Sequence, residues 1–399
     1  MDFTFRLRGS TAPLSLADWQ RRARRRVPRM VWAYVEGGAD EERTLRANRS
    51  AFEQWRLVPR ILTGTGSADL STVVAGQQLD MPVLIAPTGL NGAAHWQGDL
   101  AAARAARTVG TRLVVSSAAS YTLEEVAGEA GNGHWFQLYP WRNRALIGSL
   151  VDRARDAGYA VLVVTVDVPV YGNRLRERRV GMSVPPELTP ARILDAARHP
   201  AWVTGYLRHH RTTLANLEVP GTQGLDSFEI QTDNLGGNID WDDLAWLRSR
   251  WDGPMLVKGV LHPNDAARVV EMGADGVVVS NHGGRQLDAA VASVDALPAI
   301  VERIGDRADV LVDGGFRSAA DIATALALGA RAVLIGRPVV YGLAAGGTNG
   351  ATEVMRALRA DLERTLVLMG ASTAGELTAD HLYRVGTQTS DRRTHHVAK

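Results

Sequence analysis

Apolar segments of strand length alternate with helix-like segments along most of the chain, and this alternation restricts the fold more than any other feature. Eight apolar segments cover residues 82–86, 112–116, 135–138, 160–166, 255–257, 276–279, 310–312 and 332–335. Ala-rich stretches of helical character separate most of them, and several stretches end at a glycine suited to a left-handed helix terminus. Eight strand–helix units predict an α/β fold of the TIM (β/α)8 barrel type. An open doubly wound sheet is the alternative, and the absence of a G-x-G-x-x-G turn counts against it.

The 399 residues are expected to form a single domain with additions to the barrel. We place an N-terminal helical cap at residues 1–80, the barrel at 81–345, and C-terminal helices with a polar tail at 346–399. The connection after the fourth strand is much longer than the others, so residues 181–237 are interpreted as an insert. Long insertions occur on surface loops and often carry function.

Part of the insert, residues 190–211, is both amphipathic and basic. Such a segment can bind the surface of a membrane without crossing it, or it can cover its own barrel or a neighbouring subunit. The chain has no run of about 20 apolar residues and no secretory signal pattern. We therefore expect a cytoplasmic protein, with peripheral contact to the inner face of the membrane through the insert left open.

Charge and cysteine content exclude several other functions. The net charge is only +2, and no lysine stripe with interleaved aromatic residues is present, which argues against nucleic acid as a partner. The absence of cysteine excludes disulfides, thiolate catalysis and cysteine-bound metals, and we expect no metal ion in the site.

Polar residues follow all eight predicted strands, and in a closed parallel barrel they converge on one face. In chain order they are Thr88, Ser116, Gln137 and Tyr139, Thr165 and Asp167, Lys258, His282 and Arg285, Asp313, and Gly336 with Arg337. One such residue usually does no more than end a strand, but a complete set predicts a ligand site.

The segment Ser280–Asp288, with the sequence SNHGGRQLD, places a base, a cation and two glycines in the loop after the sixth strand. His282 can accept a proton, and Arg285 can bind a carboxylate through two parallel hydrogen bonds. This combination suits the oxidation of a small acid that carries a hydroxyl group.

The loops after the last two strands each pair glycine with arginine, in Asp313–Arg317 and in Gly336–Arg337. Backbone N–H groups freed by glycine, together with guanidinium groups, suit a phosphate, and TIM barrels often bind phosphate at these two loops. We infer a phosphorylated cofactor. The amide, hydroxyl and ammonium groups after the other strands suit an isoalloxazine ring, and a single phosphate site favours FMN over FAD. Pyridoxal phosphate bound to Lys258 stays open as an alternative.

These motifs resemble those of the FMN-dependent L-2-hydroxy acid oxidoreductases, a family that includes glycolate oxidase, L-lactate dehydrogenase, lactate oxidase and (S)-mandelate dehydrogenase. The resemblance covers about residues 18–382, with Ser280–Asp288 as the family signature. Further matching segments are Ala86–Gly89, Trp135–Tyr139, Thr165–Asp167, Val257–Gly259, Asp313–Gly315 and Ile335–Arg337. The resemblance implies FMN as cofactor, a 2-oxo acid as product and a homotetramer.

The resemblance also implies a role for each matching residue. The catalytic set would be His282 as base, Asp167 as its partner, Tyr139, Arg285 and Lys258. The substrate would contact Tyr34, Tyr139, Arg174, Arg285 and Ala118. The cofactor would contact Thr88, Gly89, Ser116, Gln137, Thr165, Lys258, Ser280, Asp313, Gly315, Arg317, Gly336 and Arg337. These residues are compatible with departure of the substrate's α-hydrogen either as a hydride or as a proton.

Two positions bear on the substrate and on the electron acceptor. Position 118 is Ala where glycolate-type members carry Trp, which leaves room for an aromatic substituent, although Tyr171 refills some of it. Gly89 stands where oxidases tend to have Ala, which favours a dehydrogenase. We expect oxidation of a bulky, mandelate-like (S)-2-hydroxy acid, with a quinone or O2 as electron acceptor. The alternative is an oxidase of lactate or glycolate that produces hydrogen peroxide.

Two further interpretations are weaker. A barrel that isomerises or condenses sugar phosphates would share the phosphate loops, but it would not explain Arg285 beside His282 or Lys258 with Gln137. A barrel used only as a scaffold would not need the His, Asp, Lys and Arg set.

Overall fold

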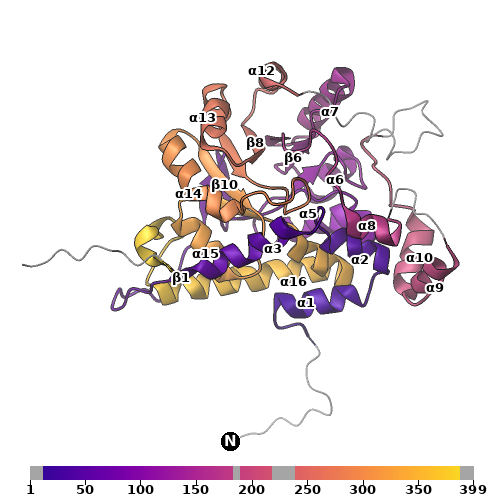
Figure 1. Ribbon diagram of the computed structural model, residues 1–399, viewed down its shortest axis with the longest axis horizontal. Coiled ribbons are helices and arrows are strands. Elements are labelled where there is room, and N and C mark those ends of the chain that lie inside the picture. Colours follow the sequence, from indigo (N-terminus) through magenta and orange to yellow (C-terminus); the bar gives the residue numbers. More distant parts are fainter. Residues whose placement is uncertain (1–11, 183–188, 218–238, 387–399) are drawn as a thin grey trace, which may run out of the picture.

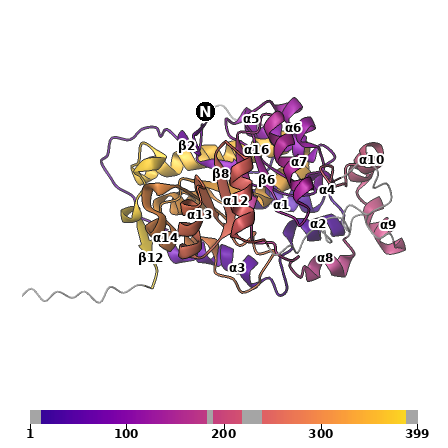
Figure 2. The same ribbon diagram turned by 90° about the horizontal axis from the view of Figure 1, so that it is seen from above.

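The centre of the computed structural model is a barrel of eight parallel strands, and the structure describes residues 12–182, 189–217 and 239–386 (Figures 1 and 2). The strands are β4 (Val83–Ile85), β5 (Val114–Ser116), β6 (Trp135–Leu138), β7 (Val161–Thr165), β8 (Met255–Val260), β9 (Gly276–Val279), β10 (Asp309–Asp313) and β11 (Ala332–Ile335). Each strand from β5 to β10 pairs with the next in chain order, and β11 pairs with β4. A parallel bridge between Ile85 and Leu113 links β4 to the start of β5. The predicted TIM barrel is confirmed.

Two apolar layers hold the barrel together. Side chains such as Leu84, Val163 and Leu311 fill the interior and are fully buried. The other face of each strand packs against surrounding helices, so the strands are continuous apolar segments, as is typical of parallel sheets buried on both sides. These helices are α5 (Gly98–Thr108), α6 (Leu123–Ala130), α7 (Arg144–Asp156), α13 (Pro263–Glu271), α14 (Ser293–Ile304), α15 (Ala319–Ala327) and α16 (Arg337–Met369).

The segment before residue 80 contributes to both ends of the barrel. The helices α2 (Arg29–Glu36) and α3 (Arg43–Ser50) lie at the end where the strands terminate, and α1 (Leu16–Arg24) packs along α16 (Figure 1). The hairpin of β2 (Thr72–Val74) and β3 (Gln77–Leu79) instead fills the opposite end of the barrel.

The C-terminal part returns to the N-terminal part. Strand β12 (Leu382–Arg384) pairs with β1 (Trp55–Leu57), and α16 is interrupted by non-helical backbone at Gly346 and Gly347, next to the boundary expected at residue 346. The expected tail, residues 387–399, lies outside the described residues.

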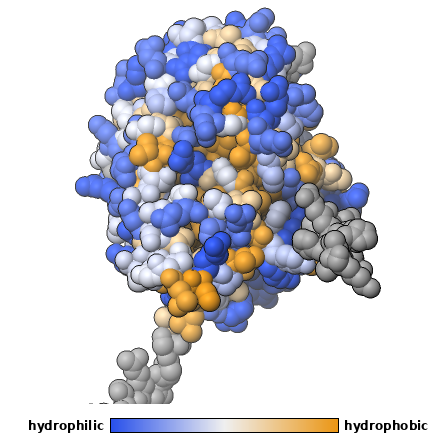
Figure 3. Space-filling view, turned by 90° about the vertical axis from the view of Figure 1, so that its left-hand side faces the viewer, coloured by the Kyte–Doolittle hydropathy of each residue, from blue (hydrophilic) through white to orange (hydrophobic). Residues whose placement is uncertain are grey.

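The face of the molecule near β1, β12 and α16 carries apolar patches among hydrophilic side chains (Figure 3), and Leu62 and Leu368 are exposed. The expected homotetramer stays a prediction.

The insert after β7 projects beside α2, away from the barrel (Figures 1 and 2). Its described parts are residues 181–182 and 189–217, which include α9 (Pro190–Ala197) and α10 (Pro200–His209), and residues 183–188 and 218–237 of the expected insert lie outside them. The indole of Trp202 donates to the backbone oxygen of Ala93 over 2.7 Å, which fixes α10 to the loop after β4. Among the described residues, no helix is both long and apolar enough to cross a bilayer.

The hairpin that fills the lower end of the barrel offers a test of core packing. Val74 is fully buried and its neighbour Val73 is about half exposed. We expect Val74→Ala to lower the free energy of unfolding by about 2 kcal/mol, because two buried methyl groups are lost and a cavity is left. Val73→Ala on the same strand is the matched control and should change it little. Urea denaturation measures both, and equal effects would contradict this packing.

Candidate active site

A cavity opens to solvent at the end of the barrel where the strands terminate, with about 1090 Å³ of empty space including its mouth. Most of the residues expected from the sequence line it. They are Tyr34, Thr88, Gly89, Ala118, Tyr139, Arg174, Lys258, His282, Arg285, Asp313, Gly315, Arg317, Gly336 and Arg337. The remaining expected residues, Ser116, Gln137, Thr165, Asp167 and Ser280, lie beneath this lining and are buried or nearly so.

The residues beneath the lining form hydrogen bonds between neighbouring strands. Ser116 donates to the amide oxygen of Gln137 over 3.0 Å, and the amide nitrogen of Gln137 donates to the hydroxyl of Thr165 over 2.9 Å. Lys258 continues the ring, because it stands opposite Thr165 in the sheet and donates to Ser280 over 3.0 Å. Strand register therefore places a polar floor under the cavity.

Lys258 and Asp313 form a nearly buried ion pair, with Nζ 3.2 Å from Oδ2. Burial alone would lower the pKa of Lys258, but the carboxylates of Asp313 and Asp167 together raise it, so the ammonium stays charged. The other carboxylate oxygen of Asp313 is buried without a hydrogen-bond partner. Since an unpaired buried oxygen is costly, this atom at the cavity wall suits a ligand hydroxyl, and the ribityl chain of FMN supplies such groups.

The two glycine–arginine loops also fit a phosphate. Gly315 has a φ of +89°, and a Cβ there would lie 2.0 Å from the backbone oxygen of Asn48, so only glycine lets the loop approach α3 this closely. The other loop leads directly into the N-terminus of α16, where the helix dipole favours an anion, although Pro338 has no N–H and the N–H groups of Val339 and Val340 bond to the backbone oxygen of Gly336. Arg317 is held over the ring of Tyr341 and donates to its hydroxyl over 3.3 Å.

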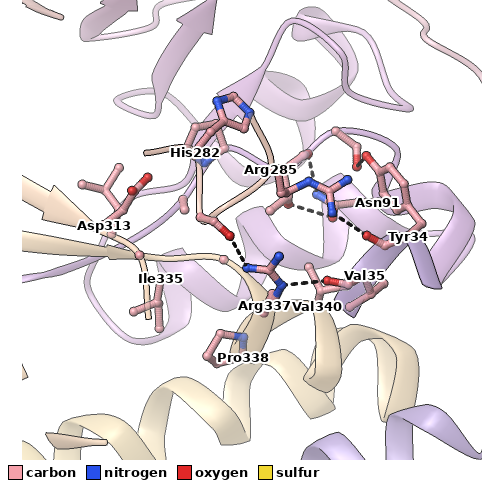
Figure 4. A pocket seen from close by; sticks show the side chains of 18 of the residues that line it. Tyr34, Val35, Asn91, His282, Arg285, Asp313, Ile335, Arg337, Pro338 and Val340 are labelled. Atoms are coloured by element: carbon pink, nitrogen blue, oxygen red, sulfur yellow. Dashed lines mark hydrogen bonds between the residues drawn. The ribbon is translucent and has the colours of Figure 1, made fainter. Parts of the chain in front are cut away.

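The position of Arg337 in the loop after β11 predicts a contact with phosphate, but its guanidinium lies against protein backbone. Its guanidinium donates to the backbone oxygen of Val35 over 2.9 Å (Figure 4). It also donates to the backbone oxygens of Gly37 and Gly283, over 2.8 and 3.1 Å. Burial and the nearby cations Arg285 and Arg317 lower the pKa of Arg337 to about 10. The side chain therefore joins α2 to the His282 loop and adds positive charge beside the cavity, and three of its five N–H donors are used on backbone oxygens.

His282 is held in one orientation by partners on both ring nitrogens. Nδ1 lies 3.0 Å from Oδ1 of Asp167, and Nε2 lies 3.3 Å from the hydroxyl of Tyr139. Its backbone is left-handed, with a φ of +59°, a conformation that is uncommon outside glycine and clusters at functional sites. The backbone N–H of His282 donates to the Ser280 hydroxyl over 3.0 Å, which stabilises this turn.

The protonation states of this pair follow from their surroundings. Burial lowers the pKa of His282 more than the Asp167 carboxylate raises it, so the imidazole is neutral near pH 7. Burial would raise the pKa of Asp167, but the cationic form of His282 and Lys258 outweigh it and lower this pKa. A neutral imidazole beside a carboxylate donates from Nδ1, which leaves the lone pair of Nε2 available as a base.

Gly259 permits this arrangement. It follows Lys258 at a bulge in β8 and has a φ of +103°, and a Cβ there would lie 2.6 Å from the side chain of Asp167. Any larger residue would displace the carboxylate that orients His282.

The two arginines expected to bind a carboxylate lie together at the cavity wall. Arg285 donates to the backbone oxygens of Tyr34 and Gly37, and to Glu177 over 2.9 Å. Arg174 lies 3.9 Å from the same glutamate and over the ring of Tyr171 at 4.7 Å. The sequence interpretation missed Glu177, although its position three residues after Arg174 on one helix was a usable signal.

A second missed contact joins the N-terminal segment to the loop that carries His282. The side-chain amides of Asn48 and Asn281 donate to each other over 2.8 Å in both directions, and both are buried. The amide oxygen of Asn281 also accepts from the backbone of Gly284 over 3.1 Å. No local pattern marks Asn48, because its partner is far away in the sequence.

The chain resembles known proteins over nearly its whole length. A family model described as FMN-dependent dehydrogenase matches residues 23–384. (S)-Mandelate dehydrogenase from Pseudomonas putida is 39% identical over 386 residues, which cover 96% of this chain and 98% of that protein. L-Lactate oxidase from a Nostoc species is 42% identical, over 94% of this chain and 99% of that protein. L-Lactate dehydrogenase from Caulobacter vibrioides is 40% identical, over 93% and 99%.

A solved structure agrees with the fold as well as with the sequence. The crystal structure of the monotopic membrane protein (S)-mandelate dehydrogenase matches with a TM-score of 0.89 and 40% sequence identity, over 93% of this chain and 99% of that chain. The chain belongs to the family of FMN-dependent 2-hydroxy acid dehydrogenases and oxidases, and FMN is its cofactor.

Proposed function

We propose that this enzyme oxidises a bulky (S)-2-hydroxy acid to the corresponding 2-oxo acid, with His282 as the base. The observation that carries the proposal is that His282, held by Asp167, shares one cavity with Arg174, Arg285 and Lys258. FMN, when bound, accepts the two electrons that leave the substrate.

Each of these residues has its own role in binding the substrate or in transferring its proton. Arg174 and Arg285 bind the substrate carboxylate, with Tyr34 and Tyr139 as phenol donors, and this fixes the α-carbon near His282. Nε2 of His282 takes a proton from the substrate, and the carboxylate of Asp167 stabilises the imidazolium that forms. Burial raises the pKa of Tyr34 to about 12, so its phenol stays neutral, and its one donor must turn from the backbone oxygen of Gly89 to reach the substrate.

The cofactor contacts are part of the same proposal. The polar floor and its neighbours face the flavin ring, and the glycine–arginine loops hold the ribityl phosphate. The residues are Thr88, Gly89, Ser116, Gln137, Thr165, Lys258 and Ser280 for the ring, and Asp313, Gly315, Arg317, Gly336 and Arg337 for the chain and phosphate. The charged ammonium of Lys258 supports a negative charge on the reduced ring.

The state of His282 predicts the pH dependence of the reaction. Because burial lowers its pKa below 6.5, the neutral base persists at pH 7 and is lost only in a more acidic range. We expect the anaerobic rate of FMN reduction by substrate to be level from pH 8 to about pH 6.5, and to fall by about tenfold per pH unit below the lowered pKa. Stopped-flow absorbance measures it.

Two variants serve as comparison in that experiment. His282→Ala should bind FMN and fold but reduce it very slowly at every pH. His262→Ala, an exposed histidine outside the cavity, should keep the wild-type profile. Normal turnover by His282→Ala would remove His282 from the mechanism.

The preference for a bulky substituent rests on Ala118. Its side chain is at the cavity wall, next to Gly89, where an added Cβ would lie 3.2 Å from the Cβ of Ala118. The hydroxyl of Tyr34, which also lines the cavity, donates to the backbone oxygen of Gly89 over 2.9 Å. Relatives named for mandelate and for lactate are about equally similar to this chain, so the proposed preference is argued from the side-chain space at residue 118.

Filling that space provides the test. Ala118→Trp should shift the ratio of kcat/KM for (S)-mandelate to that for glycolate by roughly 100-fold towards glycolate, because the indole occupies the position of the substituent. Ala118→Gly is the matched control and should retain the wild-type preference. A wild-type enzyme that prefers glycolate or L-lactate to (S)-mandelate would contradict the proposal.

We further propose that the insert lies on a membrane surface, where a quinone takes the electrons. Ile193, Leu194 and Leu207 on α9 and α10 are 55%, 59% and 60% exposed, and Arg198 and Arg208 beside them are also exposed. Exposed apolar side chains with flanking cations suit an anionic lipid surface. Gly89, which the resemblance associates with dehydrogenases, supports the same acceptor.

Vesicles of anionic phospholipid that contain a quinone test both parts. The wild type should float with the vesicles and reduce the quinone faster than it forms hydrogen peroxide in air. Replacing Ile193, Leu194 and Leu207 by Ser should abolish flotation, whereas Leu368→Ser, which changes an exposed leucine elsewhere, should not. Rapid hydrogen peroxide formation without vesicles would instead support the oxidase alternative.

A further inference from the structure

The loop that follows β4 is held from behind by two buried polar side chains. Asn91 and Asp99 are 3% and 2% exposed, and Nδ2 of Asn91 donates to Oδ1 of Asp99 over 2.8 Å. The hydroxyl of Thr88 donates to Oδ1 of Asn91, also over 2.8 Å. Since Thr88 lines the cavity, a continuous line of hydrogen bonds runs from a buried carboxylate to a hydroxyl at the cofactor site.

The carboxylate of Asp99 determines which group donates in each hydrogen bond of this line. An ionised carboxylate can only accept hydrogen bonds, so the amide nitrogen of Asn91 must face Asp99. The amide oxygen then faces Thr88 and takes its hydroxyl proton. The second oxygen of Asp99 accepts the backbone N–H of Ser120 over 2.8 Å, and this donor cannot turn round. Thr88 therefore presents lone pairs, and not its proton, to the cavity.

The surroundings leave Asn91 little freedom to move. Its Nδ2 also donates to the backbone oxygen of Thr88 over 3.2 Å. A Cβ at Gly98 would lie 2.3 Å from the backbone of Asn91, and a Cβ at Gly92 would lie 1.8 Å from the backbone oxygen of Arg211. The backbone of Asn91 thus has little room to shift, and the line changes by rotation of the side-chain amide, which also ends its hydrogen bond to the backbone oxygen of Thr88.

We propose that Asp99 is a positioning residue for FMN, which acts through Asn91 to make Thr88 a hydrogen-bond acceptor towards the cofactor. FMN carries the matching donors, an N–H group on the ring and hydroxyl groups on the ribityl chain. This rests on the contact between Thr88 and the cofactor proposed above. If residue 99 becomes a donor, the amide of Asn91 turns, and the proton of Thr88 points at a donor of the cofactor. The loss of one hydrogen bond weakens FMN binding by about tenfold.

The test is a double-mutant cycle on the binding of FMN, followed by FMN fluorescence during titration of the apo-protein. Asp99→Asn keeps the shape of the side chain, removes its charge and adds a donor, and it should weaken binding about tenfold. Thr88→Val removes the hydroxyl, and Thr88→Ser is the matched control that keeps it. Because Asp99 acts through the hydroxyl, Asp99→Asn should cause no further loss in the Thr88→Val background.

The FMN affinities of these variants show which part of the proposal is wrong. If Asp99→Asn has no effect, or weakens FMN binding equally in the wild-type and Thr88→Val backgrounds, the proposal for Asp99 is overturned while the contact between Thr88 and FMN stands. If Thr88→Val binds FMN as tightly as Thr88→Ser, the contact itself is wrong, and the proposal for Asp99 is overturned with it.

A pH titration supplies a second measurement that needs no change at residue 99. Burial raises the pKa of Asp99 to about 6, and the protonated acid is a donor, as Asn is. The phenols of Tyr121 and Tyr159, whose pKa values are raised, stay neutral in this range, and His95 on the turn before α5 titrates separately. The wild type should lose about tenfold more FMN affinity between pH 8 and pH 5 than Thr88→Val does. An equal loss in both proteins would assign the pH effect to another group, such as His95, and would overturn the proposal.

Discussion

Charged side chains buried at one end of a barrel are the constraint on which the rest of this structure depends. A buried ion without a partner costs several kcal/mol, so each charge beneath or beside the cavity needs an opposite charge or a donor within reach. The parallel strand register provides these partners, because it places Lys258 next to Thr165 and brings Ser280 and Asp313 to the same level. The strand pairing that builds the barrel therefore also places the charges of the site next to their partners.

The N-terminal segment completes what the barrel begins. The backbone oxygens of α2 and the turn after it accept hydrogen bonds from Arg285 and Arg337, and the amide of Asn48 pairs with that of Asn281. Two neighbouring cations that would repel each other are thus held by backbone oxygens, and both donate to that of Gly37. The loop that carries His282 is fixed from two sides, by Asp167 in the barrel and by α3 outside it. This is why a left-handed turn at a histidine can persist.

Much of this fold and site could be predicted from the sequence, because the relevant signals are local. A strand buried on both faces is a continuous apolar segment, and β6 has the predicted bounds, residues 135–138. The polar residue after each strand marks the mouth of the barrel without any knowledge of packing. The partners could not be predicted in the same way. Asn48 looks like any polar residue on a helix, and three donors of Arg337 are used on backbone oxygens that no sequence pattern locates.

The hairpin of β2 and β3 shows the same limit at the other end of the barrel. Its apolar residues are evident in the sequence, but nothing local tells that they enter the barrel and do not cover the site. Only the closure of eight strands creates the opening that they fill.

The close approach at Gly92 has a consequence for how the molecule transmits movement. The returning end of the insert touches the backbone there, at Arg211, with no room for even one methyl group between them. Gly92 belongs to the segment after β4 that lines the cavity, and Arg211 follows α10 in the insert. A displacement of the outer helices would therefore be passed on by direct steric contact to the loop after β4, whose residues line the cavity.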